Sequence, residues 1–99
     1  MRLTEEQIQT IRRLAHELGG PQARVRVFGS RLDDSMRGGD LDLMLELDSA
    51  VEHPAMLAAR MSAQVSRALG GRKVDVLISA PNLARLPIHD SAFAHGQLL

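Results

Sequence analysis

Two short polar motifs in the first half of the chain contain the residue types that phosphoryl-transfer chemistry needs. Gly29-Ser30-Arg31 follows a short apolar segment, and Asp40 and Asp42 open the next one. Alternate side chains of a β-strand share a face, so the two carboxylates are expected to point the same way. Paired carboxylates beside a small-residue turn that can bind phosphate indicate metal-assisted phosphoryl or nucleotidyl transfer.

A third aspartate, Asp75, lies within the apolar segment 73–79, where strand propensity does not favour an aspartate. A carboxylate buried in a sheet must be neutralised, paired or bound to a metal. If this segment pairs with the strand of Asp40 and Asp42, the three carboxylates can meet on one face. Such a set could hold two hard cations about 3.5–4 Å apart. Ligand sets made only of oxygen favour Mg²⁺ or Mn²⁺ over zinc.

Each polar residue of the two motifs has an expected role. Gly29 lets the backbone approach a phosphate closely, and the Ser30 hydroxyl can bond a phosphate oxygen. Arg31 offers a planar fork of donors to the same group. Asp75 is placed to accept the proton of an attacking hydroxyl that comes within hydrogen-bond reach. Asp40 and Asp42 are expected to hold the metal that binds the phosphates.

The elements that must position these residues alternate along the chain. A helix is predicted from the Thr4–Gln7 capping-box pattern to Gly19, and a loop with a helical turn over residues 30–39. The other expected elements are strands 24–28, 40–48 and 73–79, a helix from Pro54 to Gly70, a short helix 88–95 and a terminal segment 97–99. This order predicts a small mixed α/β or α+β sheet with helices packed on one face.

Composition limits the classes of protein to consider. Ninety-nine residues make one domain, 1–99, with a single modest core. Twelve acidic and twelve basic residues leave no net charge, so direct binding to nucleic acid or to a membrane surface is not expected. Neither a membrane-spanning apolar run nor a signal peptide is recognisable, and a cytoplasmic location is expected.

Taken together, Gly29-Ser30-Arg31, the pair Asp40 and Asp42, and Asp75 resemble the GS…DxD…D pattern of the DNA polymerase β-type nucleotidyltransferases. The short chain and its leading helix are similar to the minimal nucleotidyltransferases of that superfamily. The resemblance extends from the first helix to the third strand and implies the same fold. It also implies that the Gly-Ser pair holds the phosphates of ATP or another nucleoside triphosphate, and that the aspartates bind the metal ions.

The resemblance implies a partner as well. Minimal nucleotidyltransferases are commonly paired with HEPN-domain proteins in prokaryotic toxin–antitoxin modules, and some transfer AMP from ATP to a tyrosine of the toxin. The expected protein is therefore an antitoxin that adenylylates a HEPN toxin within a hetero-oligomer. Its small size agrees with this, because a chain of this length has no second lobe to grip the acceptor.

Some observations favour alternatives. Gly39 stands where the family often has Ser or Thr, and Asp33 and Asp34 stand where Ala-Arg-Gly is common. These departures motivate a second hypothesis, a catalytically weak or inactive module that neutralises its partner by binding alone. Locally, Asp75 could pair with Arg26 across the sheet, and the alternating strand could simply have one solvated face.

Overall fold

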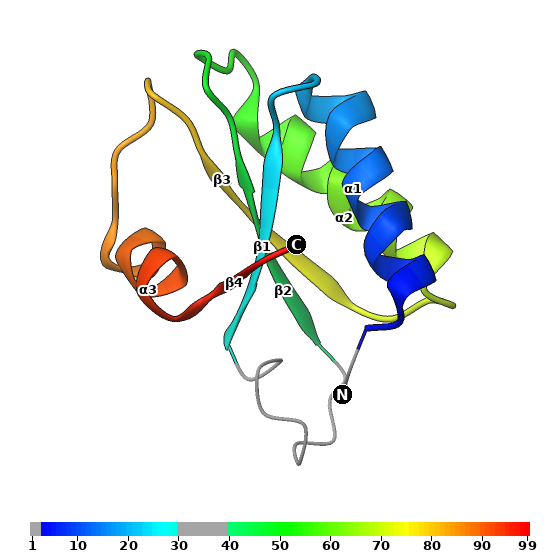
Figure 1. Cartoon of the computed structure of the whole chain (residues 1–99). Coiled ribbons are helices and arrows are strands. Elements are labelled where there is room, and N and C mark those ends of the chain that lie inside the picture. The colour runs from blue at the N-terminus through cyan, green and yellow to red at the C-terminus, as the bar shows by residue number, and fades with distance from the viewer. Residues whose placement is uncertain (1–2, 30–39) are drawn as a thin grey trace.

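The first helix begins at the residue that the capping pattern indicates. In the computed structural model, which describes residues 3–29 and 40–99, α1 spans Glu5–Gly19 (Figure 1). Thr4 Oγ1 accepts a hydrogen bond from the Gln7 N–H at 3.1 Å, and the Gln7 side chain accepts one from the Thr4 N–H at 2.9 Å. This reciprocal pair satisfies two of the N–H groups that the start of a helix otherwise leaves without partners.

The described residues form a mixed sheet of four strands. After α1 the elements are β1 (Arg24–Phe28), β2 (Leu41–Glu46), α2 (Pro54–Ala68), β3 (Val74–Ser79), α3 (Pro87–His95) and β4 (Gln97–Leu98). The strand order in space is β3-β2-β1-β4, with β2 and β3 parallel and the other neighbours antiparallel. Helix α2 supplies the crossover that two parallel neighbours require. The predicted α+β sheet is therefore confirmed.

Helix α2 begins at Pro54. Proline suits the first turn of a helix, because an N–H group there has no partner within the helix and no hydrogen bond is lost. Like α1, α2 is 15 residues long. A bilayer crossing needs about 20 apolar residues. Within residues 3–29 and 40–99, none of the helices combines the length and the apolar character that a crossing requires.

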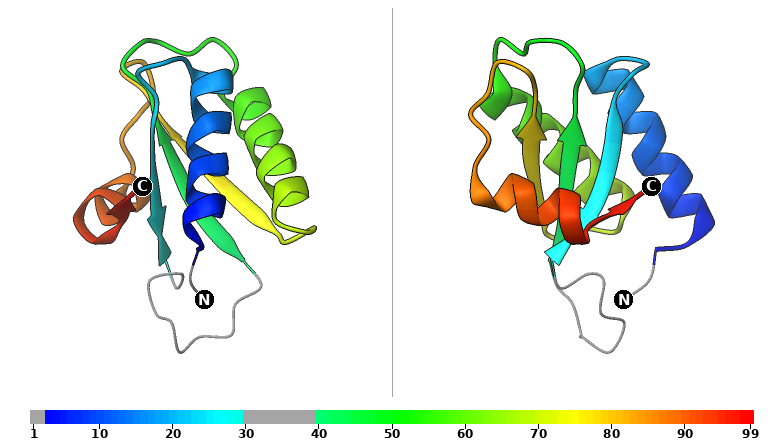
Figure 2. Two further views of the ribbon diagram at one scale, coloured as in Figure 1. Left: turned by 45° about the vertical axis from the view of Figure 1, so that its right-hand side comes forward. Right: turned by 60° about the vertical axis from the view of Figure 1, so that its left-hand side comes forward.

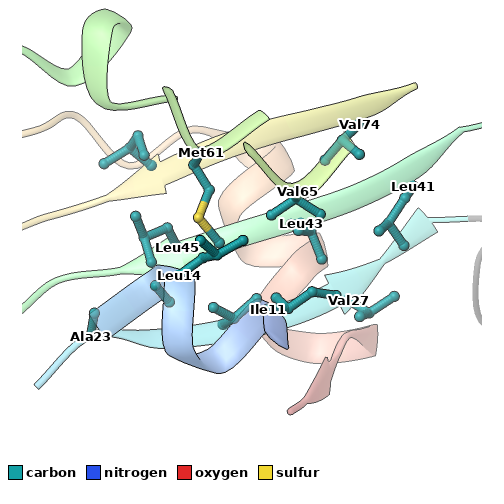
Figure 3. Packing of buried hydrophobic residues seen from close by; sticks show 13 residues of the cluster. Ile11, Leu14, Ala23, Val27, Leu41, Leu43, Leu45, Met61, Val65 and Val74 are labelled. Atoms are coloured by element: carbon teal, nitrogen blue, oxygen red, sulfur yellow. The ribbon is translucent and has the colours of Figure 1, made fainter. Parts of the chain in front are cut away.

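The main core lies between the sheet and the helices α1 and α2. Leu41, Leu43 and Leu45 of β2 are fully buried on this side, as the alternation of the sequence predicts. Met61 and Val65 of α2 pack against these leucines (Figure 3). Burying a leucine side chain contributes about 1.5–3 kcal/mol. These contacts therefore hold the central strand firmly in the sheet.

The short helix α3 lies on the opposite face of the sheet, which separates it from α1 and α2 (Figure 2). On β2 this face carries Asp42, Met44 and Glu46, and Met44 and Glu46 are buried. The hypothesis of a solvated second face is therefore wrong for this part of β2. The predicted packing of helices on one face holds for α1 and α2, and α3 adds a smaller layer on the other.

One hydrogen bond and one cation–π contact attach α3 to the sheet. The buried His89 accepts a hydrogen bond from the Leu86 N–H on Nδ1, and its Nε2–H donates to the Ile78 carbonyl of β3, each at 2.9 Å. Two arginines, one from β1 and one from the loop before α3, lie over the ring of Phe93. His89 therefore caps the first turn of α3 and ties it to β3.

Candidate functional site

The predicted acidic residues gather at one end of the sheet, the lower end in Figure 1. Strand β1 finishes at this end and β2 begins there, so that Phe28 lies opposite Asp42 in the antiparallel register. Strand β3 runs parallel to β2 and starts at the same end, with Asp75 opposite Asp42. We call the group formed by Gly29, Asp40, Asp42, Lys73 and Asp75 the aspartate site.

Asp42 and Asp75 form the centre of the aspartate site. They occupy one register position on neighbouring strands, which lie about 4.8 Å apart, and therefore share a face. This placement confirms the expectation that Asp75 joins Asp42. The burial argument for Asp75 is wrong, because its side chain is exposed, whereas Asp42 is partly buried. The proposed pairing of Asp75 with Arg26 is not observed either.

Arg26 binds Glu46 instead. Its Nε lies 2.7 Å from Glu46 Oε2, and Arg24 Nε lies 3.6 Å from the other carboxylate oxygen. Arg24 also bonds Asp48 at 3.0 Å, and this hydrogen bond is the main cause that raises the pKa of the Arg24 guanidinium. Both arginines of β1 therefore form ion pairs with carboxylates at the end of β2 that is remote from the aspartate site.

Gly29 follows β1 and lies directly against the carboxylate of Asp42. Its φ of +72° belongs to the left-handed region, which a residue with a Cβ rarely adopts. A Cβ at this position would lie 2.5 Å from Asp42 Oδ2, closer than the two atoms can approach. Glycine is therefore favoured by the backbone turn, and a larger residue here would displace the end of the Asp42 side chain.

Asp40 immediately precedes β2, and the same alternation places it on the side of Asp42. Its Oδ2 lies 3.9 Å from Nζ of Lys73, the residue just before β3. Both side chains are more than half exposed. Sequence reasoning gave Lys73 no role. The sequence signal that could have identified Lys73 is its position two residues before Asp75, because residues two apart in an extended segment lie on the same side of it.

The donor chemistry of the aspartate site fits Mg²⁺. Its candidate ligands are carboxylates, and Mg²⁺ in proteins is usually bound by one or two carboxylates together with water and substrate phosphates. The register pair Asp42 and Asp75, with Asp40 nearby, supplies such ligands. Within residues 3–29 and 40–99, no three His, Cys, Asp or Glu side chains stand close enough together to ligate one metal ion. The observed arrangement therefore suits a cation that shares its coordination with a nucleotide.

The other half of the predicted site lies outside the described residues. This applies to Ser30 and Arg31, the expected phosphate ligands, and to the departures from the family pattern at Asp33, Asp34 and Gly39. The helical turn expected within residues 30–39 falls there too. Their roles therefore stay predictions.

Comparison with known proteins rests on fold. No family model matches the chain, and no curated protein matches it in sequence. A crystal structure of a toxin–antitoxin with AMP-PNP superposes with a TM-score of 0.66 at 15% identity, over 97% of this chain and 72% of that chain. The fold is shared with a toxin–antitoxin protein. The small mixed α+β fold that the motifs predict is therefore one that a toxin–antitoxin structure also has.

Two variants of the toxin–antitoxin MntA-HpeT also share the fold. One carries a tyrosine-to-alanine substitution and matches with a TM-score of 0.63 at 16% identity, over 98% of this chain and 71% of that one. In the other, two aspartates are replaced by glutamate; its TM-score is 0.66 at 13% identity, over 97% and 72% of the two chains. The shared fold therefore extends over nearly the whole of this chain.

Proposed function

We propose that this protein is a Mg²⁺-dependent nucleotidyltransferase that transfers AMP from ATP to a tyrosine hydroxyl of a HEPN-domain toxin and so acts as its antitoxin. The observation that carries the proposal is the register of Asp42 and Asp75, with the Gly29 backbone against Asp42. The shared fold supports it, because one similar toxin–antitoxin structure contains AMP-PNP and another carries substitutions of two aspartates.

The reaction assigns a task to each residue of the site. The acceptor oxygen forms a bond to the α-phosphorus while the bond from that phosphorus to the bridging oxygen breaks, and pyrophosphate leaves. Asp75 accepts the hydroxyl proton, a task for which its exposed carboxylate is accessible. Asp40 and Asp42 would hold one Mg²⁺ and Asp75 would help to hold a second, and these ions would neutralise negative charge on the phosphates as the pyrophosphate departs.

The openness of the aspartate site favours a macromolecular acceptor. Asp75 and Asp40 are exposed, so a hydroxyl on the surface of another protein can reach the carboxylates without entering a cavity. Gly29 is exposed as well and presents backbone without a side chain. A folded partner that covers the site would exclude water from the reaction while it delivers its own hydroxyl.

The direct test uses ATP labelled either on the α- or on the γ-phosphate, with Mg²⁺ and the cognate HEPN protein. Adenylyl transfer labels the partner only from α-labelled ATP, whereas phosphoryl transfer labels it only from γ-labelled ATP. Asp42→Asn and Asp75→Asn should each remove the label. Asp48→Asn is the matched control, because Asp48 is an exposed aspartate just beyond the other end of β2. Unchanged transfer in both site variants would refute the mechanism.

A second candidate is neutralisation of the toxin by binding alone. It is favoured by the finding that the described aspartates do not form a three-residue metal cluster. In this case Asp75→Asn would bind and neutralise the toxin as well as the parent chain does, and Mg²⁺ with ATP would leave the melting temperature unchanged. A ligand that binds only the folded state must raise that temperature, so the two candidates predict opposite results.

A further inference from the structure

Lys73 is the only lysine in the chain, and its main chain is fixed at the aspartate site. Its carbonyl oxygen accepts a hydrogen bond from the Leu41 N–H at 2.9 Å, which joins the residue before β3 to the first residue of β2. The side chain is 68% exposed, and its Nζ lies 3.9 Å from Asp40 Oδ2. The backbone therefore sets the position of this residue, and the ammonium group is able to move.

The contact between Lys73 and Asp40 is too loose to have a mainly structural role. A charge-assisted hydrogen bond between ammonium and carboxylate is about 2.7–2.9 Å long, well below the observed 3.9 Å. Ion pairs between exposed side chains contribute little to stability, because water competes for both partners. The ammonium can therefore leave Asp40 for a stronger anion without loss to the fold.

The position of Lys73 relative to Asp75 indicates which anion that is. The two residues are two positions apart, so they lie on one side of the segment, about 6–7 Å apart along it. A proton acceptor must lie close to the attacked phosphorus. A cation at this distance from the proton acceptor can contact a part of the same ligand that lies farther from that phosphorus. In a nucleoside triphosphate that part is the β- and γ-phosphates, which leave as pyrophosphate.

We propose that Lys73 binds the β- and γ-phosphates of the nucleotide, and the pyrophosphate that leaves, by exchanging Asp40 for a phosphate oxygen when the ligand binds. The inference rests on the proposed function in taking a nucleoside triphosphate as the substrate of this site. Its electrostatic reason is that a polyphosphate approaching the carboxylates of Asp40, Asp42 and Asp75 is repelled. A compact ammonium with three donors offsets that repulsion.

The single lysine allows a direct measurement. Reductive methylation with ¹³C-formaldehyde retains the positive charge and gives one dimethyl-lysine NMR signal, apart from that of the terminal amine. Titration with pyrophosphate or ATP in the presence of Mg²⁺ should shift this signal. AMP with Mg²⁺, which lacks the β- and γ-phosphates, and Mg²⁺ alone should shift it much less. Equal shifts with ATP and AMP would overturn the assignment.

Substitutions provide a second readout. Lys73→Met should weaken the binding of Mg²⁺-pyrophosphate about tenfold, as expected for the loss of one charged hydrogen bond, and leave AMP binding unchanged. Lys73→Arg should retain most of the affinity, because the charge remains. Arg13→Met is the matched control, since Arg13 is a 60% exposed, ion-paired cation on α1. Equal weakening of AMP and pyrophosphate binding by Lys73→Met would contradict the proposal.

The two proposals fail separately. If the HEPN partner is labelled from ATP while neither pyrophosphate nor ATP moves the lysine signal, Lys73 does not bind the polyphosphate and the transfer function stands. If both ligands move the signal but no label is transferred, the Lys73 assignment is supported and the proposed transfer fails. Pyrophosphate is the decisive probe, because its binding does not depend on any transfer.

Discussion

Gly29→Ala should damage the aspartate site more than it destabilises the fold. The substitution adds one methyl group at a residue whose φ is +72°, and that methyl carbon would lie 2.5 Å from Asp42 Oδ2. The backbone cannot relax freely, because Phe28, the preceding residue, is paired with Asp42 in the sheet. The carboxylate of Asp42 is the end of a side chain and can rotate, so we expect it to yield.

The magnitude follows from two contributions. A left-handed conformation costs a residue with a Cβ about 1–2 kcal/mol, and the lower entropy of the unfolded chain offsets about 0.4–1 kcal/mol of this. We therefore expect a loss of roughly 1 kcal/mol in the free energy of unfolding, or about 4–8 °C in Tm. The Asp42 carboxylate must retreat by about 1 Å, and a misplacement of this size can reduce a reaction rate about 100-fold.

Gly70→Ala separates these contributions. Gly70 has nearly the same φ, +77°, but a Cβ there would meet no atom within 4 Å. Urea unfolding should show similar losses of stability for the two variants. Label transfer, and the rise in Tm caused by Mg²⁺ with ATP, should be lost only in Gly29→Ala. If the two variants behave alike in both assays, the contact between Gly29 and Asp42 does not shape the site.

Two further predictions concern the face that α3 covers. Arg26→Met should lower the free energy of unfolding by about 1.5–3 kcal/mol, because it removes a charged hydrogen bond to the buried Glu46. Arg24→Met, at a more exposed residue, should lower it by less than about 1 kcal/mol. A larger loss for Arg24→Met than for Arg26→Met in urea unfolding would contradict the assigned pairing. Met44→Ala should lower the free energy of unfolding by about 2–5 kcal/mol, because Met44 is fully buried. Met56→Ala, at a 55% exposed residue, should change it by less than about 0.5 kcal/mol. Equal shifts in Tm for the two variants would show that the face of β2 that carries Met44 is open to water.

The sequence predicted the elements whose signals are local. The capping pattern at Thr4 located the start of α1, and the alternating leucines of β2 identified the face that packs against the helices. Position and order of the motifs were sufficient to place Asp75 beside Asp42, because a crossover helix leads to a parallel neighbour.

The second face of the sheet was missed for a physical reason. Met44 and Glu46 alternate with leucines, a pattern that an amphipathic strand with one solvated face also has. They are buried because α3, from the far end of the chain, packs on that side, and because Arg26 neutralises Glu46. Such contacts join residues that are distant in sequence, and no local pattern encodes them. The contact of Gly29 with Asp42 is of the same kind.

The parallel register of β2 and β3 also has a consequence for the order of folding events. Like charges directly opposite each other destabilise a strand pair, and this pair places Asp42 opposite Asp75 near its start, one position after Leu41 beside Val74. Farther along, the same two strands place Leu43 beside Val76 and Leu45 beside Ile78. Pairing is therefore expected to nucleate among these apolar residues and to reach the aspartates late. A cation that binds both carboxylates would then favour this late pairing of β2 with β3 and slow the separation of the two strands.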